Sequence, residues 1–194
     1  GLAGDALTDA DENVVVGYGA LTSDTLGSKS TAIGRAALAT QNFTSATDSY
    51  NTAVGYYAGL MLTTGRFNNL IGGLAGDALT DGSANVAIGY GALSSDTRGQ
   101  SSVAIGHAAL ESQNFTSSAD SFNTAVGKSA GNRVTTGINN TLLGNAAGND
   151  LTDADFNTAV GSNSLREDTL GSRSTALGYY ALGNQNFTSA TDTY

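Results

Sequence analysis

The sequence contains no cysteine, no proline and no tryptophan, and only 13% of its 194 residues are charged. Without cysteine, the chain forms no disulfide and offers no thiolate to a metal ion. Lys and Arg together number 8 and the net charge is −9, so the clustered basic residues that bind nucleic-acid phosphates are missing. No apolar run approaches the roughly 20 residues of a membrane helix, and we expect no membrane insertion in this segment.

Residues for catalysis are also scarce. The one histidine, His107, lies in AIGHAAL at a position that is Tyr18, Arg35 or Lys128 in similar segments of the chain. A general base is not expected at a position that accepts such different side chains, and without a base a Ser nucleophile stays unactivated. We therefore expect no catalytic residue, no cofactor and no enzymatic activity.

The sequence does contain a repeated motif, N/S-x-x-(V/I/L)-G, of which NTAVG and STAIG are examples. Successive motif glycines follow one another at a 17-residue or a 21-residue spacing. The spacings combine into a longer, 72-residue period, because GLAGDALTD at Gly1 returns at Gly73 and the chain aligns with itself at that shift without a gap. The motif glycines are Gly17, Gly34, Gly55, Gly72, Gly89, Gly106, Gly127, Gly144, Gly161 and Gly178.

A 17-residue period is too short for helical hairpin repeats, and no apolar stripe of period 3.6 is present. It fits one turn of an all-β, parallel β-solenoid (a β-roll) in which each 72-residue unit has three 17-residue rungs and one 21-residue rung. Rungs stack at about 4.8 Å, so the ten motif rungs predict a rod of roughly 50 Å. The units of this single solenoid segment are 1–72, 73–144 and a partial unit at 145–194. Because the chain begins without Met and stops one residue before an expected Asn, we expect a fragment of a longer fibre.

The alternation of side chains along each motif strand predicts which of them face the core. The fourth position is always Val, Ile or Leu, as at Val54, and we expect it to face the interior. The third position is mostly Ala and points the other way, and a strand that is apolar on both faces is normally covered on both. We therefore expect the alanines to pack against other chains in a parallel homotrimer or, alternatively, against a second wall of the same coil. The predicted oligomer-interface residues are Ala32, Ala53, Ala87, Ala104, Ala125, Ala159 and Ala176.

Asparagine opens most motifs, as at Asn51 and Asn123, and Ser30, Ser102 and Ser174 replace it in one rung of each unit. Stacked amides bond to their neighbours above and below, so this column predicts a polar ladder along the rod. The motif glycines predict a backbone conformation or a close approach that a Cβ atom would block.

The segments NTAVGYYAG, NVAIGYGAL and SSVAIGHAAL resemble the head repeats of trimeric autotransporter adhesins, the YadA-like head. Similar repeats occur in tail fibres of bacteriophages. The resemblance covers nearly the whole chain, although the rungs are longer than those of the familiar head coil. It implies three left-handed parallel β-rolls side by side, displayed on a bacterial cell surface or a virion and used for attachment.

The 21-residue rungs contain the best candidates for ligand binding. Their turns are QNFTSATDSYN, QNFTSSADSFN and QNFTSATDTY, which start at Gln41, Gln113 and Gln185. Loops on a rigid scaffold commonly bind ligands, and repetition gives avidity for a weak ligand such as a host surface glycan or a matrix protein. Alternatively, the aromatic side chains of these turns pack against the coil or a neighbouring chain. The candidate ligand-binding residues are Asn42, Phe43, Thr44, Asn114, Phe115, Thr116, Asn186, Phe187 and Thr188.

Two acidic turns, TDADEN at Thr8–Asn13 and TDADFN at Thr152–Asn157, contain the carboxylates that a Ca²⁺ site needs. Neither turn matches the EF-hand spacing, and Asp11 is replaced by Ser83 in the middle unit. We favour solvated turns and expect no metal site.

These features predict an extracellular, non-enzymatic fibre or adhesin head segment that supplies a rigid stalk and repeated loops for attachment to a host or surface. A receptor-binding shaft of a phage tail fibre is the alternative. An ice-binding solenoid is less favoured, because an ice-binding face needs an unbroken Thr array and the second motif position includes Val14, Asn69 and Val86.

Overall fold

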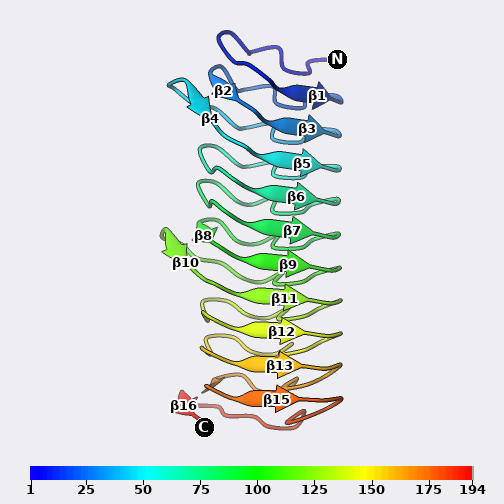
Figure 1. Ribbon diagram of the computed structural model, residues 1–194, viewed down its shortest axis with the longest axis vertical. Helices are drawn as coiled ribbons and strands as arrows, with labels where there is room; N and C mark the ends of the chain where they lie inside the picture. The colour runs from blue at the N-terminus through cyan, green and yellow to red at the C-terminus, as the bar shows by residue number, and fades with distance from the viewer. Residues whose placement is uncertain (194) are drawn as a thin grey trace.

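The computed structural model describes residues 1–193, which form one rod of about eleven stacked turns (Figure 1). One face of the rod is a ten-stranded parallel sheet, to which each motif contributes a strand of three residues. No helix in this part of the chain is long and apolar enough to cross a membrane. The strands, in sheet order, are β1 (Val14–Val16), β3 (Thr31–Ile33), β5 (Thr52–Val54), β6 (Asn69–Ile71), β7 (Val86–Ile88), β9 (Val103–Ile105), β11 (Thr124–Val126), β12 (Thr141–Leu143), β13 (Thr158–Val160) and β15 (Thr175–Leu177).

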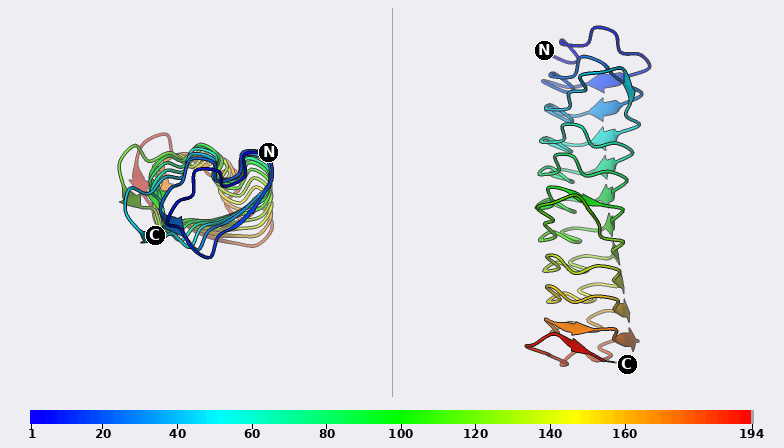
Figure 2. Two further views of the ribbon diagram at one scale, coloured as in Figure 1. Left: turned by 90° about the horizontal axis from the view of Figure 1, so that it is seen from above. Right: turned by 90° about the vertical axis from the view of Figure 1, so that its left-hand side faces the viewer.

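Three pairs of two-residue strands lie outside the main sheet, at one end of the cross-section of the coil (Figure 2). Each pair joins the turn of a 21-residue rung to the rung before it. The pairs are β2 (Gly27–Ser28) with β4 (Thr47–Asp48), β8 (Gly99–Gln100) with β10 (Ala119–Asp120), and β14 (Gly171–Ser172) with β16 (Thr191–Asp192). The long turns therefore project from the same side of the rod at regular intervals.

The strand register agrees with the repeat spacing. Thr31 pairs with Val14, one 17-residue rung before it, and with Thr52, one 21-residue rung after it. The other neighbours in the main sheet are likewise offset by one whole rung of either length. The prediction of an all-β parallel solenoid is confirmed.

The side-chain alternation runs opposite to the prediction. The motif alanines point into the coil, and Ala32, Ala53 and Ala87 are 0% exposed within a single chain. The aliphatic fourth position points outward, and Val16 is 56% exposed. A side chain with no exposed surface has no contact to offer another chain, so the predicted alanine interface is wrong and the alternative, a second wall of the same coil, is correct. The correction applies to Ala32, Ala53, Ala87, Ala104, Ala125, Ala159 and Ala176.

The physical reason for this inversion is the narrow interior of the coil. Three residues after most motif glycines, a second alanine points inward from the opposite wall, as Ala58 and Ala92 do. A leucine or valine from the same wall fills much of the remaining space, and the buried residues of both walls form one core cluster. In a close-packed layer of this width a methyl group fits on the sheet side, so the larger Val and Ile side chains face outward.

Two rungs place leucine where most others have alanine, and neighbouring rungs compensate for its size. Leu70 fills the space beside Gly59 and Gly76, because a Cβ atom at either glycine would lie 2.8 Å from a Leu70 methyl carbon. Leu142 repeats this arrangement one unit later. Side-chain volumes are thus matched between rungs, and the packing repeat is the four-rung unit.

A buried polar ladder runs along the rod, as predicted. The Asn68 N–H donates to Asn51 Oδ1 at 2.9 Å, and the Asn85 N–H donates to Asn68 Oδ1 at 3.0 Å. The side-chain amides also donate to backbone carbonyls, as Asn51 Nδ2 does to Gly65 O at 2.8 Å. Because these side chains are buried, each rung depends on its neighbours to satisfy its polar groups.

The motif glycines permit the closest approach between rungs. Gly89 has a φ of 135°, and a Cβ atom there would lie 2.4 Å from the carbonyl oxygen of Gly106. The same approach recurs along the motif glycines from Gly17 to Gly161. Any side chain at these positions forces two rungs apart, which confirms the steric reason predicted for the glycines.

We predict that Gly89→Ala lowers the free energy of unfolding by about 3 kcal/mol, because the new Cβ atom meets a hydrogen-bonded backbone. Gly91→Ala is the matched control: Gly91 also has a positive φ, of 64°, but a Cβ atom there meets nothing closer than 3.9 Å. Gly91→Ala should lower the free energy of unfolding by about 1 kcal/mol, because alanine is less stable than glycine at a positive φ. Urea denaturation followed by circular dichroism measures both variants, and equal losses would contradict the close-approach explanation.

Candidate functional site

The turns of the 21-residue rungs form a row along one edge of the rod, where β4, β10 and β16 lie (Figures 1 and 2). They precede the motif strands in the chain, whereas the motif glycines follow those strands. The row therefore lies beside the main sheet and leaves the sheet face uncovered. We refer to these segments as the long turns.

A buried carboxylate anchors the first long turn. Asp24 Oδ1 accepts hydrogen bonds from the backbone N–H groups of Gly27 (3.0 Å) and Phe43 (3.1 Å). Asp24 Oδ2 accepts a hydrogen bond from Gln41 Nε2 at 2.6 Å. These N–H donors supply the partners that a fully buried carboxylate requires.

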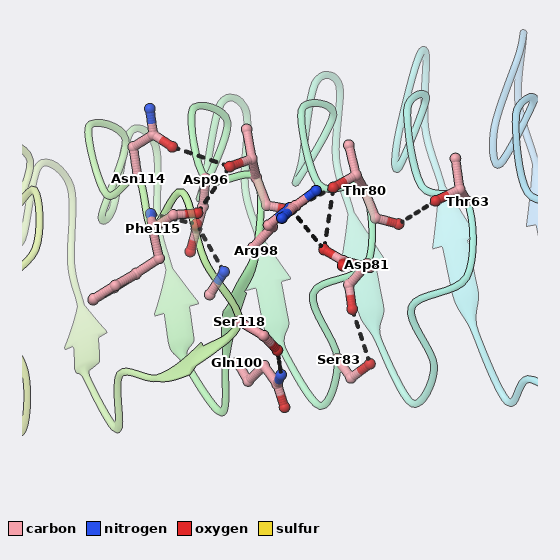
Figure 3. Close-up of polar contacts among 12 residues, drawn as sticks. Thr63, Thr80, Asp81, Ser83, Asp96, Arg98, Gln100, Asn114, Phe115 and Ser118 are labelled. Carbon is pink, nitrogen blue, oxygen red and sulfur yellow. Dashed lines mark hydrogen bonds and ion pairs between the residues drawn. The ribbon is translucent and has the colours of Figure 1, made fainter.

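The anchor recurs in the other two units. Asp96 accepts hydrogen bonds from the Phe115 N–H (3.1 Å) and from Gln113 Nε2 (2.6 Å), and Figure 3 shows the contact with Phe115. Asp168 makes the same contacts in the third unit. Sequence reasoning missed these carboxylates because they belong to the preceding rung. The available signal was an Asp that recurs one 17-residue rung before the first Gln of each long turn.

Gln41 also joins the long turn to the asparagine ladder. Its Nε2 donates to Ser30 Oγ at 2.9 Å, and Asn51 Nδ2 donates to its Oε1 at 2.8 Å. The short Ser30 side chain leaves room in the ladder, and the Gln41 amide fills it. Ser102 and Gln113 repeat the arrangement, which explains why a Ser rung precedes each long turn.

Much of the predicted ligand-binding set holds the turn in place. Phe43 and Phe115 are only 5% and 8% exposed, which agrees with the alternative interpretation that these aromatics pack against the coil. Asn42 is exposed, and its Oδ1 accepts a hydrogen bond from Thr25 Oγ1 at 3.3 Å. Among the remaining candidates, Phe187 is half-buried and Asn114, Asn186, Thr44, Thr116 and Thr188 are exposed. Tyr194, the last residue of the third long turn, lies outside the described residues.

The second aromatic residue of each complete long turn is the exposed one. Tyr50 and Phe122 are 49% and 55% exposed. Tyr50 stacks on Phe67 of the next rung with ring centroids 5.8 Å apart, and Lys29 Nζ lies 5.3 Å from the Tyr50 centroid. The predicted ligand contacts are the first aromatic residues of these turns, because residue type alone does not distinguish an anchoring ring from an exposed one.

An open cleft of about 550 Å³ lies between the first long turn and the acidic turn near the start of the chain. One of its carboxylates, Asp48, receives a hydrogen bond from Lys29 Nζ at 2.6 Å. This bond holds the pKa of Asp48 below its usual range and raises the pKa of Lys29. The pair therefore stays charged at neutral pH. The cleft is lined by Asp9, Asp11, Ser28, Ala46, Thr47, Asp48 and Arg66.

One further carboxylate is unusual. Asp77 Oδ1 is buried without a hydrogen-bond partner, and burial raises the pKa of this group. Asn149, at the same position of the next unit, donates from Nδ2 to the carbonyl oxygen of Ser129 at 3.1 Å. An amide therefore fits this position better than a carboxylate.

The remaining titratable candidates do not converge. Across residues 1–193, no group of three or more His, Asp or Glu side chains is arranged to hold a metal ion. His107 is exposed and stacks on Tyr90 of the rung before it, with ring centroids 5.7 Å apart. The acidic turns thus contribute single carboxylates to the surface and not a ligand set.

Comparison with protein-family models, curated proteins and solved structures finds no match to this chain. What the geometry itself offers is a row of anchored turns, exposed aromatic rings at the ends of two of them, and a polar cleft beside the first.

We predict that Phe115→Ala lowers the free energy of unfolding by about 3 kcal/mol, because it empties the packed position under the second long turn. Phe122→Ala, in the same turn, should change it by less than about 1 kcal/mol, since that ring is largely exposed. Thermal or urea denaturation followed by circular dichroism distinguishes the two. The anchoring role fails if Phe122→Ala is the more damaging change.

Proposed function

We propose that this chain is a non-enzymatic segment of an extracellular attachment fibre, of the adhesin-head or phage tail-fibre type. Its role is to hold long turns at fixed intervals on a stiff, self-associated rod. The observation that carries the proposal is the row of three anchored turns, each bonded to the coil through a buried or half-buried set of Asp and Gln side chains. A turn that merely connected two rungs would need no such anchor.

The spacing of the long turns supports multivalent attachment. Adjacent long turns are one unit apart, which is four rungs or roughly 19 Å along the rod. Two turns of one rod can therefore reach neighbouring sites on a repetitive surface, and the second contact then forms at high effective concentration. Weak individual contacts are sufficient for firm attachment under these conditions.

The uncovered face of the main sheet supports self-association. Its outward positions, the second and fourth of each motif, include no charged residue. A partner with the same rung spacing can interdigitate with this face along its whole length, and a second copy of the chain has that spacing. The outward aliphatic column consists of Val16, Ile33, Val54, Ile71, Ile88, Ile105, Val126, Leu143, Val160 and Leu177.

The energies favour association only when many rungs take part. Burying the exposed part of one Val or Ile side chain contributes about 1 kcal/mol. Association costs at least about 4 kcal/mol in lost translational and rotational freedom. One or two rungs are therefore too few, whereas the ten strands of this sheet are enough. A parallel homotrimer buries this face of every chain around one axis.

We expect the chain to be trimeric in solution and the double variant Ile88→Lys, Ile105→Lys to be monomeric. The two ammonium groups would lie on adjacent rungs of the buried face without partners. Ser95→Lys, at an exposed position outside the sheet, is the control and should keep the trimer. Native mass spectrometry or sedimentation gives the masses. A monomeric wild type, or one unchanged mass for all three proteins, would refute this arrangement.

Attachment itself is tested by shortening the long turns. Replacing each with the turn of a 17-residue rung deletes four residues per turn and leaves the strands intact. We expect the shortened rods to keep their circular dichroism spectrum and their oligomeric state but to lose binding to arrays of glycans and matrix proteins. A rod in which two 17-residue turns are exchanged is the control. If shortened rods bind as well as the wild type, or if the wild type binds no array surface, the attachment function is wrong.

A further inference from the structure

The cleft beside the first long turn contains polar groups of both signs that lack partners. Asp9 and Asp11 line it together with Arg66, and none of the three forms a salt bridge within residues 1–193. The Arg66 guanidinium lies 5.2 Å from the centroid of the Phe67 ring, a cation–π contact that limits its freedom and leaves its N–H groups available. All three side chains are exposed.

The lining residues come from successive rungs of the solenoid. Asp11, Ser28, Asp48 and Arg66 each belong to a different rung, so the cleft extends over roughly 14 Å of the rod. Asp48 is fixed by Lys29, and the Ser28 hydroxyl accepts a hydrogen bond from the Asp11 N–H at 2.9 Å. The walls of the cleft are thus held by the fold, while Asp9, Asp11 and Arg66 remain free to contact a ligand.

The middle unit closes the same place with its own side chains (Figure 3). Asp81, the counterpart of Asp9, forms an ion pair with Arg98 at 3.5 Å. Gln100, the counterpart of Ser28, donates from Nε2 to the Ser118 hydroxyl. Ile138 stands in place of Arg66. The polar groups that are free in the first unit are therefore paired or replaced in the second.

The third unit repeats most of the lining residues of the first cleft, but its carboxylates have partners. The Asp155 N–H donates to Ser172 Oγ at 3.0 Å, which repeats the contact of Asp11 with Ser28. The lining residues of the first cleft other than Arg66 recur one for one as Asp153, Asp155, Ser172, Ala190, Thr191 and Asp192. Asp153 there accepts a hydrogen bond from the Thr136 hydroxyl, and Asp155 Oδ1 accepts one from the Ile138 N–H at 2.7 Å. The free carboxylates are therefore a feature of the first unit, and the closed middle copy is a natural comparison within the same chain.

The mixture of free groups selects one class of ligand. Anionic ligands are repelled by Asp9, Asp11 and the net charge of −9. A cationic ligand meets Arg66, and a metal ion finds no group of three acidic or imidazole ligands in the described chain. Neutral vicinal hydroxyls can bind both the carboxylates and the guanidinium of the cleft, because each hydroxyl can donate to a carboxylate and accept from a guanidinium. The open, polar form of the cleft also suits a hydrated ligand better than an apolar one.

We propose that this cleft binds a neutral, hydroxyl-rich saccharide, with Asp9 and Asp11 accepting hydrogen bonds from its hydroxyls and Arg66 donating to its oxygens. The inference deepens the proposed attachment function and rests on it. Binding at a single cleft is weak, on the order of 1 mM, because the site is open to water. Several copies of the cleft, one on each chain of an oligomer, supply the avidity.

The test is an NMR titration of the ¹⁵N-labelled full chain with maltotriose, mannotriose and galactotriose, with sialyllactose, spermine and Ca²⁺ as charged comparisons. At least one neutral trisaccharide should shift the amide signals of Asp11, Ser28 and Arg66. Asp11→Ser, Arg66→Ile and the pair Ser28→Gln with Ala46→Ser should each weaken that binding about tenfold or more. All of these residues occur naturally at the same places in the middle unit, as Ser83, Ile138, Gln100 and Ser118, so the variants are expected to fold.

Two further variants complete the test: one is a control, and the other is designed to create a binding site in the middle unit. Thr136→Ser, at an exposed position of another turn, should leave the affinity unchanged. Opening the middle unit with Ser83→Asp, Arg98→Leu, Gln100→Ser, Ser118→Ala and Ile138→Arg, which are the residues of the first unit, should create a second set of shifted signals and add one equivalent to the binding stoichiometry. Each cleft variant is compared with the wild type by circular dichroism before titration.

The outcomes separate this inference from the attachment function. The saccharide site is wrong if only the charged compounds shift these signals or if no trisaccharide does. It is also wrong if the three cleft variants bind a trisaccharide as tightly as the wild type. If that happens while the long-turn rods still bind the arrays, only the cleft assignment is wrong. If a trisaccharide binds in the cleft while the rods attach to nothing, the cleft assignment stands and the attachment function is wrong.

Discussion

Backbone hydrogen bonds between successive rungs, such as Gly106 N–H to Ile88 O at 2.7 Å, hold every turn in register with its neighbours. At this spacing there is no room for a side chain where the rungs turn, and glycine is required there. The same register places identical side chains directly above one another. Asparagine amides then bond along the rod and methyl groups stack in the core. The polar ladder, the thin core and the row of long turns all follow from this single stacking relation.

The repeat spacing predicted the architecture because residues one repeat apart in the sequence of a solenoid lie one rung apart in space. A motif that returns at a 17-residue or 21-residue spacing has one way to stack in parallel, and the pairing of Thr31 with Val14 and Thr52 reproduces it. The direction of the alternation was not predictable from one strand. The motif T-A-V is apolar on both faces, and only the second wall, with Ala58 and its neighbours, determines that the smaller residue faces inward. The interior width depends on both walls together.

The place of the long turns was predictable from the sequence, but their contacts were not. Four extra residues per unit indicated where the rod widens, and the structure places a long turn there. Which side chain holds such a turn depends on contacts between rungs. Phe43 and Tyr50 are both aromatic residues of one turn, yet Phe43 is packed beside the backbone that Asp24 binds, whereas Tyr50 faces solvent. Whether a cleft is open or closed likewise depends on pairs such as Gln100 with Ser118, whose members belong to different rungs.

The fit of Leu70 between Gly59 and Gly76 has a consequence for how such a rod changes length. A single rung that is duplicated or lost would bring leucine against leucine, or glycine against alanine, and would leave overlap or empty space in the core. A whole unit can be added or removed without disturbing any contact, because its last rung already fits the first rung of another copy. Lineages that carry this sequence should therefore vary in rod length by steps of one 72-residue unit, roughly 19 Å each. The length of the rod is then a discrete quantity, fixed by the sizes of a few buried side chains.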